Sequence, residues 1–574
     1  MRLKINKSKH SISYDVIKSA YINNKRTSVI VEKLGNEEYI KKTYKVTDAE
    51  AWARAHVEEL NKAAENNLLE TTINFNSSKD ISSKQRHFNG GYLFLQAVYY
   101  DLGLDKICKS IKSRHSFEYN LNSVLSRLVY TRIIFPSSKL SSYEQSNDFI
   151  EAPDFQLHDI YKALSLLSSE SDYIQSALYK NSLKLSNRQT NIIYYDCTNF
   201  FYEIEEADED GLRQYGYSKE HRPNPIVQMG LFMDGNGIPL AFCINPGNTN
   251  EQQTLRPLEQ KLIDDFNLSK LIVCTDAGLS SNDNRKFNNK RDRAFITTQS
   301  IKTLKKHLQD WALESSGWKT FYDQSEYDIS LLDEEKYHDT IFYKERWINE
   351  NGLEQRLIVT YSIKSRNYQR NIRNKQITRA QNLLNNNAGT EINHHRQTDY
   401  KRFITMKTCT EDGEIAEKKL YELNQGVIDK EESFDGFYGI CTNVESSVQS
   451  IVNLNHRRWE IEECFRIMKT EFKSRPVFLQ RDDRIKAHFM TCFIALTIFR
   501  YVEMKLNDKY PCHEIIKALR EISFIKLEGH GFIPTFSNTE IIQDLHKAFG
   551  FNTAKEIVPI TEMKKICSIT KKGV

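Results

Sequence analysis

The sequence predicts an α/β protein with a mixed sheet flanked by helices, a β-rich insertion in that sheet, and a helical N-terminal domain. Three patterns support this fold class. Apolar residues recur at helical spacing over residues 91–185, short apolar strands alternate with helices over 189–300, and strand-like alternation with turn residues fills much of 301–440.

The composition indicates a soluble globular protein of several domains. The chain has 574 residues, of which 39% are hydrophobic, 27% charged and 11% aromatic. This profile excludes disordered, collagen-like and coiled-coil proteins. Because the formal net charge is only +4, any nucleic-acid contact must come from local patches.

The sequence carries no pattern typical of membrane, secreted or zinc-binding proteins. The longest apolar run, 489–499, is far shorter than the ~20 residues of a membrane span, so we expect a buried helix there. No apolar stretch follows the first basic residues, which predicts a cytoplasmic protein. The ten cysteines are scattered singly without a Cys-x-x-Cys pair, which argues against a zinc module and a disulfide framework.

The N-terminal part divides into two predicted domains. Alternating residues 11–47 indicate a small antiparallel meander, and a helix follows at 47–69, which together give a domain over 1–70. Residues 71–188 form a helical domain that is a candidate for DNA binding, although a plain helical bundle is slightly favoured.

The first part of the predicted core covers residues 189–300. A strand at Ile192–Tyr195 ends at Asp196, and a second apolar strand at Leu271–Thr275 ends at Asp276. The other predicted elements are a hairpin of Ile226–Met233 and Ile238–Ile244 around an Asp-Gly-Asn-Gly turn, helices near 252–266 and 282–289, and a strand at Ala294–Thr298. Asp234 in the hairpin turn is interpreted as a turn residue.

A β-rich insertion over 301–440 separates this part from a second core part at 441–510. Its clearest element is a hairpin of Tyr337–Trp347 and Leu353–Tyr361, and further strands are expected at 402–412 and 439–442. The C-terminal region 511–574 shows a strand-like 521–527 and a helical 539–549, and no chemistry is assigned to it.

Residues 362–379 of the insertion carry six cations and no acid. Such a stripe attracts phosphates, but it is equally typical of the solvated face of an exposed helix. The six are Lys364, Arg366, Arg370, Arg373, Lys375 and Arg379.

The two aspartates that follow strands are candidate metal ligands. Reactive groups gather at the carboxyl ends of strands in an α/β sheet, and Mg²⁺ prefers oxygen ligands. A pair of such ions activates an attacking oxygen and stabilises a leaving one at a phosphodiester. A single aspartate after a strand more often bonds to backbone amides, so a third acid is needed to decide between these interpretations.

The third acid is best sought in the predicted helix 455–469. Its apolar face includes Ile461, Cys464 and Phe465, and a polar stripe runs beside that face. Within the stripe, one carboxylate that holds a metal ion and four cations that hold neighbouring phosphates would together bind a nucleic-acid backbone. The commoner explanation of such a stripe is i,i+4 pairing between Arg and Glu on an ordinary amphipathic helix. The stripe consists of Arg458, Glu462, Arg466, Lys469 and Lys473.

These residues match a family pattern. Arg458-x3-Glu462-x6-Lys469 resembles the Arg, Glu and Lys of the Tyr-x2-Arg-x3-Glu-x6-Lys (YREK) signature of DDE insertion-sequence transposases. Further stretches resemble the same family in the same order, over about residues 85–505: Tyr195–Glu203, Gly216–Pro223, Gly237–Leu240, Gly247–Asn250, Thr275–Gly278 and Asp435–Asn443.

The resemblance implies an RNase H-like catalytic domain with Asp196, Asp276 and Glu462 as catalytic, metal-binding residues. The implied cofactor is Mg²⁺, which Mn²⁺ can replace. The long separation of Asp276 from Glu462 fits members of this group that carry a β-rich insertion. The signature tyrosine is replaced by Asn455, and its neighbour His456 is a further candidate phosphate donor, although a structural histidine is the commoner case.

The resemblance also implies DNA as the partner. Arg458, Lys469, Arg466 and Lys473 are candidate DNA-binding residues, together with Asn455, His456 and, on the loop before the second strand, Arg222. The implied activity is cleavage at the terminal inverted repeats of an insertion sequence and joining of the ends to target DNA, by a homodimer that brings two DNA ends together on the nucleoid, without a membrane.

Two alternatives remain from the sequence. One is an RNase H-like nuclease without strand transfer, which the insertion and the basic stripe of 362–379 disfavour. The other is a domesticated or inactive transposase that only binds DNA, which the complete set of three acids disfavours.

Overall fold

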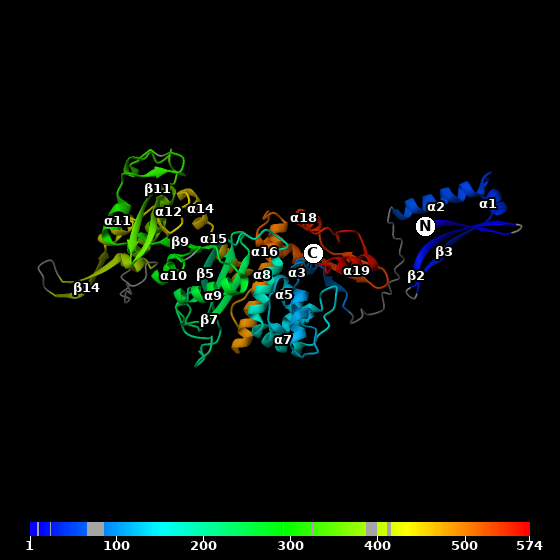
Figure 1. The fold of residues 1–574 in the computed structure, drawn as a ribbon, viewed down its shortest axis with the longest axis horizontal. Coiled ribbons are helices and arrows are strands. Elements are labelled where there is room, and N and C mark those ends of the chain that lie inside the picture. The colour runs from blue at the N-terminus through cyan, green and yellow to red at the C-terminus, as the bar shows by residue number, and fades with distance from the viewer. Residues whose placement is uncertain are drawn as a thin grey trace. The chain divides into compact units, whose positions relative to one another are not determined.

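The computed structural model describes residues 1–8, 11–22, 25–65, 85–290, 292–323, 325–385, 399–409 and 415–573. The chain forms two compact units, Met1–Lys84 and Gln85–Val574 (Figure 1). The predicted boundary at residue 70 lies outside the described residues.

The first unit is a three-stranded antiparallel sheet with two helices. Strands β1 (Arg2–Lys7), β2 (Ile12–Ile22) and β3 (Lys25–Asn36) precede helices α1 (Glu37–Tyr44) and α2 (Ala49–Glu65). The Asn36 side chain caps α1 by accepting a hydrogen bond from the backbone N–H of Tyr39 at 2.8 Å. A small core that includes Val16, Leu34 and Ile40 holds the helices on the sheet. The predicted meander of 11–47 contains strands β2 and β3 but also helix α1, and residues 66–69 of the predicted helix 47–69 lie outside the described residues.

The second unit begins with β4 (His87–Asn89) and six helices, as the helical spacing predicted. They are α3 (Tyr92–Asp101), α4 (Leu104–Arg114), α5 (Leu121–Ile134), α6 (Lys139–Ser146), α7 (Leu157–Ser169) and α8 (Ser171–Ser182). These helices share one hydrophobic core with the central sheet and with the buried helix α16 (Asp482–Lys505). They are therefore part of the second unit and not a separate N-terminal domain, because their apolar faces are buried by the rest of that unit.

Helix α16 contains the long apolar run of 489–499. By length and composition it could cross a membrane, but 89% of its apolar window is buried inside the protein. It lies against α3, α5, α7 and β7, as expected for the central helix of a core.

The central sheet has nine strands in the order β10-β11-β12-β15-β9-β8-β5-β6-β7. Strands β5 (Ile192–Phe201), β8 (Leu271–Thr275) and β9 (Arg293–Gln299) are parallel, while β6 (Ile226–Asp234) and β7 (Pro239–Pro246) form the predicted hairpin. Helices α9 (Glu251–Phe266) and α10 (Asn282–Phe287) connect these strands. The sequence therefore predicted the order of elements in this part correctly.

The insertion extends the central sheet. Strands β10 (Lys319–Thr320), β11 (Phe342–Glu350), β12 (Leu353–Tyr361) and β15 (Phe437–Thr442) join it because β15 pairs with β9. The prediction of a distinct β-rich subdomain thus needs correction: the sheet continues through it, and it also holds helices α11 (Lys306–Leu313), α12 (Ile363–Asn385) and α13 (Gln425–Glu432). Strands β13 (Ile404–Cys409) and β14 (Ile415–Leu423) form a separate hairpin.

The chain then returns to the core, and its C-terminal region lies beside the start of the second unit. Helices α14 (Val448–His456) and α15 (Trp459–Arg466) precede a π-helical turn, Ile467–Glu471. After α16 come α17 (Cys512–Glu521), β16 (Ser523–Leu527), β17 (Gly531–Pro534), α18 (Glu540–Phe549), β18 (Val558–Pro559) and α19 (Ile560–Ile569). Strand β16 pairs with β4, so the C-terminal region closes a four-stranded sheet with the start of the second unit.

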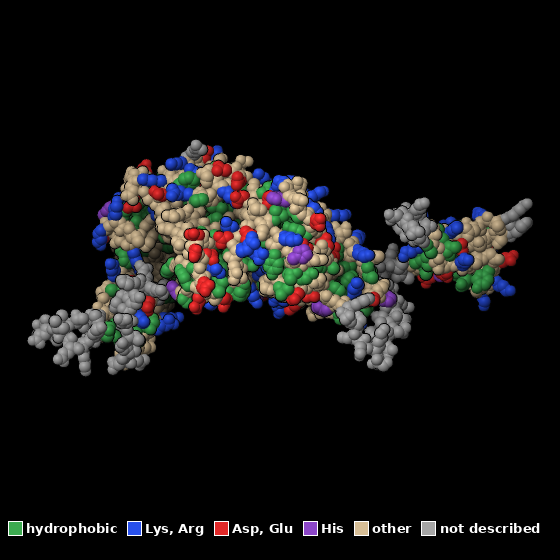
Figure 2. Space-filling model, turned by 90° about the horizontal axis from the view of Figure 1, so that it is seen from below, with side chains coloured by type: hydrophobic (Ala, Val, Ile, Leu, Met, Phe, Trp, Pro, Cys, Tyr) green, Lys and Arg blue, Asp and Glu red, His purple; other side chains and the backbone are tan. Residues whose placement is uncertain are grey.

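Most of the basic stripe on α12 is neutralised within the insertion. Four of its six cations contact carboxylates: Lys364 with Asp339 at 3.0 Å, Arg366 with Glu334 at 2.7 Å, Arg370 with Glu432 at 3.1 Å and Arg373 with Asp435 at 2.6 Å. Four of the six cations of the stripe are therefore explained by ion pairs within the insertion and not by DNA contacts. On the face shown in Figure 2, positive and negative side chains are likewise interspersed.

A buried ion pair fixes the turn between β6 and β7. Asp234 is fully buried, accepts hydrogen bonds from the backbone N–H groups of Asn236 and Ile238, and pairs with the guanidinium of Arg188. The turn requires Gly237, whose φ is +77° and where a Cβ atom would lie 2.6 Å from Arg500. Asp234 is thus a turn residue, as predicted, and also one partner of a buried salt bridge.

We expect Arg188→Leu to lower the free energy of unfolding of the second unit by about 3–5 kcal/mol, because it leaves the carboxylate of Asp234 buried without a counter-charge. The matched control is Arg466→Leu, which removes an exposed ion pair with Glu463 and should cost less than about 1 kcal/mol. Urea unfolding of both variants measures the difference, and equal losses would contradict the role of the buried pair.

Candidate active site

Two of the three predicted acids lie next to each other on the central sheet. Tyr195 of β5 is paired with Thr275 of β8, so the residues that follow, Asp196 and Asp276, lie at the same edge of this parallel pair. One correction concerns β5, which was expected to end at Asp196 but continues to Phe201. It continues because its second half still pairs with β6 after β8 has ended.

Arg458 brings the third acid, Glu462, into this group. Its Nη2 lies 3.1 Å from Oδ1 of Asp276 and 4.0 Å from Oε1 of Glu462, and its Nη1 donates a hydrogen bond to Thr298 Oγ1 at 2.7 Å. Arg458 is largely buried, whereas the side chains of Asp276 and Glu462 are 50% and 65% exposed. The two exposed carboxylates therefore share one fixed cation.

Asp196 holds its charge in a poorly solvated position. Burial raises the pKa of Asp196 to about 6, and Asp276 adds to the rise, while Lys219 and Arg458 oppose it. Its Oδ1 accepts a hydrogen bond from the backbone N–H of Cys197 at 2.7 Å. An elevated pKa in a carboxylate cluster is typical of a functional site.

Two lysines flank Asp196. Lys469 Nζ donates to Thr198 Oγ1 at 2.7 Å, and burial together with the charge of Lys219 lowers the pKa of Lys469 to about 8. Lys219 Nζ donates to the carbonyl of Cys197 at 2.5 Å and pairs with Glu251 at 3.1 Å. Burial lowers the pKa of Lys219, but the carboxylates of Asp196 and Glu251 outweigh it and hold that pKa above its usual value.

Lys219 is a further site residue that the sequence patterns do not predict. It belongs to the stretch Gly216–Pro223, from which Arg222 was chosen instead. In the structure Arg222 is exposed and lies over the ring of Phe201, 4.0 Å from its centroid, while Lys219 is the residue close to the carboxylates. Lys219 is identified by its hydrogen bond to the carbonyl of Cys197, the residue after Asp196.

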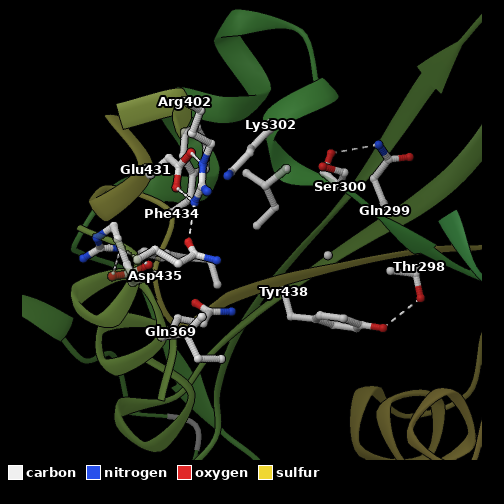
Figure 3. A pocket seen from close by; sticks show the side chains of 16 residues that line it. Thr298, Gln299, Ser300, Lys302, Gln369, Arg402, Glu431, Phe434, Asp435 and Tyr438 are labelled. Atoms are coloured by element: carbon white, nitrogen blue, oxygen red, sulfur yellow. Dashed lines mark hydrogen bonds and ion pairs between the residues drawn. The ribbon is translucent and has the colours of Figure 1, made fainter. Parts of the chain in front are cut away.

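Asn455 joins the site through a tyrosine from the insertion. Its Nδ2 donates to the hydroxyl of Tyr438 at 3.0 Å, and this hydroxyl lies 2.7 Å from Thr298 Oγ1, which in turn accepts from Arg458. Asn455 is buried, so it orients Tyr438 and does not face solvent. Figure 3 shows Tyr438 and Thr298 at one end of a pocket of about 420 Å³ whose other end is lined by Arg402, Glu431 and Asp435.

Three of the predicted DNA-binding residues lie apart from the carboxylates. Arg466 pairs with Glu463, and His456 is exposed on the last turn of α14. Lys473 was predicted on the same helical stripe as Glu462, but the helix gives way to the π-helical turn Ile467–Glu471 and Lys473 lies beyond it with φ of +45°. The predicted stripe therefore ends at Lys469.

The donor set fits a hard divalent cation in chemistry, because it consists of carboxylate oxygens. Within the described ranges, however, no three His, Cys, Asp or Glu side chains are grouped closely enough to hold a metal ion. Arg458 supplies a positive charge next to Asp276 and Glu462. A metal ion bound by Asp276 and Glu462 would therefore take the place of the Arg458 guanidinium.

Comparisons with known proteins place the chain in context. A family model described as Transposase DDE domain matches residues 201–498, over half of the chain. This match contains Asp276 and Glu462 and begins at the last residue of β5, just after Asp196. No curated protein matches the chain.

Two transposase complexes are among the solved structures to which this chain is similar. One is a piggyBac transposase synaptic complex with hairpin DNA, with 7% identity, a TM-score of 0.35, and coverage of 83% of this chain and 85% of the other. The second is a Mos1 transposase paired-end complex with the left transposon end, with 11% identity, a TM-score of 0.14, and coverage of 30% and 58%.

We expect Asp196→Asn to raise the free energy of unfolding by about 1–2 kcal/mol at pH 7.5 without divalent ions, because it removes a poorly solvated charge. A folded pKa of about 6, above the unfolded value, means that the wild type loses stability as pH rises towards 6. The gain should therefore vanish near pH 4.

Urea unfolding at pH 7.5 and pH 4 measures this gain, with the exposed Asp283→Asn as the control. A gain that persists at pH 4, or one that the control shares, would contradict the assigned environment of Asp196.

Proposed function

The chain belongs to the transposase DDE domain family, and on that premise we propose that it is a transposase that binds the ends of an insertion sequence, cleaves the DNA there and joins the ends to target DNA. The observation that carries the proposal is the shared cation Arg458, which contacts Asp276 and Glu462 beside Asp196. The three acids come from chain segments far apart in sequence, and two of them are open to solvent.

Asp196, Asp276 and Glu462 are the residues that would hold Mg²⁺, or Mn²⁺ in its place. Such ions, when bound, activate an attacking oxygen and stabilise a leaving one at a phosphodiester. The chain prepares this site by keeping Asp276 and Glu462 accessible and by holding Asp196 in place with the N–H of Cys197. Asp196 must be ionised to act as a ligand, which favours pH values above about 6.

The cations around the acids would contact DNA phosphates. Lys469, Lys219 and Arg458 lie within one cluster with the acids, and each phosphate that they neutralise adds salt-dependent affinity. Arg458, Glu462 and Lys469 support assignment to the YREK-signature group with an RNase H-like core. Asn455 departs from that signature and orients Tyr438 instead.

The active assembly that we propose is a homodimer that holds two DNA ends on the nucleoid in the cytoplasm. Support for this assembly comes from the family and not from contacts within this chain.

The decisive experiment measures Mg²⁺- or Mn²⁺-dependent cleavage of a duplex that carries the DNA ends flanking the gene. Glu462→Gln should reduce cleavage by more than the roughly 10–100-fold that loss of an outer-shell partner costs, while binding of the ends persists. The matched control is Glu463→Gln, one residue along the same helix, which pairs with Arg466 away from the carboxylates and should retain cleavage.

Each alternative outcome would indicate a different function for this chain. End binding without cleavage in the wild type would indicate a DNA-binding protein only, and cleavage without joining to target DNA would indicate a nuclease. Cleavage that survives Glu462→Gln would mean that another residue is the third acid.

Lys469→Met should weaken cleavage and lower the dependence of DNA binding on salt by about one phosphate contact. The reason is that the Lys469 ammonium is held at Thr198, two residues from Asp196. Binding measured by fluorescence anisotropy from 50 to 300 mM salt tests this expectation, and an unchanged salt slope would place Lys469 outside the DNA path.

A further inference from the structure

A second pocket, outside the carboxylate cluster, lies between the start of α6 and the segment 473–479. We refer to it as the α6 pocket. Its volume is about 380 Å³. Its titratable lining residues are Arg132, Lys139, Tyr161, Lys473, Arg475 and His488, and its described lining contains no aspartate or glutamate.

Three cationic or basic side chains of this pocket are buried. Lys139 is 6% exposed, and its ammonium has no hydrogen-bond partner among the described residues. Arg132, 4% exposed, donates to the carbonyls of Phe472 and Ser137, each at 3.1 Å, but its Nε has no partner. His488 Nε2 lies 3.2 Å from the carbonyl of Ser474. Burial of an unpaired ammonium costs free energy. A bound anion beside Lys139 would offset this cost.

Of the two nearby carboxylates, one pairs with Arg475 of the pocket lining, and neither contacts Lys139 or Arg132. Glu220 contacts Arg475 and also lies 3.6 Å from Lys469, while Asp483 pairs with Arg481 and accepts from Ser165. Burial lowers the pKa of Lys139 to about 7, and the charge of Arg132 lowers it further. No carboxylate of the described chain offsets this effect.

The neutral groups of the pocket also favour an anion. Ser137 and Ser138 line it, and Ser138 is the N-cap of α6, so the positive end of that helix dipole opens on the pocket. Hydroxyls, a helix N-terminus and several cations around one space are the donors that a tetrahedral oxyanion requires.

We propose that the α6 pocket binds a phosphate group, with the ammonium of Lys139 and the guanidinium of Arg132 as its principal counter-charges. The phosphate belongs either to a DNA backbone or to a free phosphorylated compound. Glu220 connects the pocket to the carboxylate cluster, because it contacts both Arg475 of the lining and Lys469. Phosphate binding itself does not depend on the proposed transposase activity.

The test is calorimetric titration of the full chain with inorganic phosphate, at constant ionic strength and without DNA or divalent ions. Wild type should bind at one site, and Lys139→Met should weaken this binding at least tenfold. Lys517→Met is the control, because Lys517 is an exposed helical lysine, 71% accessible, whose loss should leave phosphate affinity unchanged. Circular dichroism verifies that each variant is folded.

A second variant guards against failure of Lys139→Met to fold. Lys473 is an exposed residue of the pocket lining, so Lys473→Met should fold normally and weaken phosphate binding at least twofold. No phosphate binding by the wild type, or equal binding by wild type and both pocket variants, would overturn the proposal.

Competition identifies the source of the phosphate. Displacement of ³²P-labelled inorganic phosphate by duplex DNA in the wild type would support a DNA backbone phosphate. Retention of the label in saturating DNA would support a free phosphorylated compound. Because neither titration involves cleavage, loss of DNA cleavage in Glu462→Gln and loss of phosphate binding in Lys139→Met remain separate results.

Discussion

The parallel pairing of β5 with β8 is the constraint on which the rest of the candidate site depends. It places Asp196 and Asp276 at one edge of two neighbouring strands that are almost fully buried. Helix α15 adds Arg458 and Glu462 because Ile461, Cys464 and Phe465 anchor it in the same core. A small shift of the β5–β8 register would separate the acids, since successive residues point to opposite faces of a sheet.

Charge balance stabilises the carboxylates of the candidate site. Arg458 lies between the two exposed acids, and Lys219 and Lys469 flank the poorly solvated Asp196. The insertion contributes to this arrangement because β15 pairs with β9 and carries Tyr438 to Thr298 (Figure 3). The nine-stranded sheet therefore connects the insertion directly to the strands that carry the acids.

Local sequence patterns predicted much of the fold. The features that they did not predict depend on pairing between strands that are distant in sequence. The hairpin of β6 and β7 and the buried run in α16 are coded by nearby residues, so their positions were predicted closely. The continuation of β5 to Phe201 and the union of the insertion with the central sheet depend on strands distant in sequence. For the same reason Lys219 was missed and Lys473 was placed on a helix that ends before it.

The most direct test of the central claim is a crystal structure of the chain soaked in Mn²⁺, with the ion located by its anomalous scattering. The account predicts an anomalous peak within coordination distance of Asp196 and Asp276, with Glu462 turned towards it and Arg458 displaced from Asp276. A peak elsewhere, or an occupied site that leaves the Arg458–Asp276 contact at 3.1 Å intact, would contradict the assignment of these three acids to one metal site.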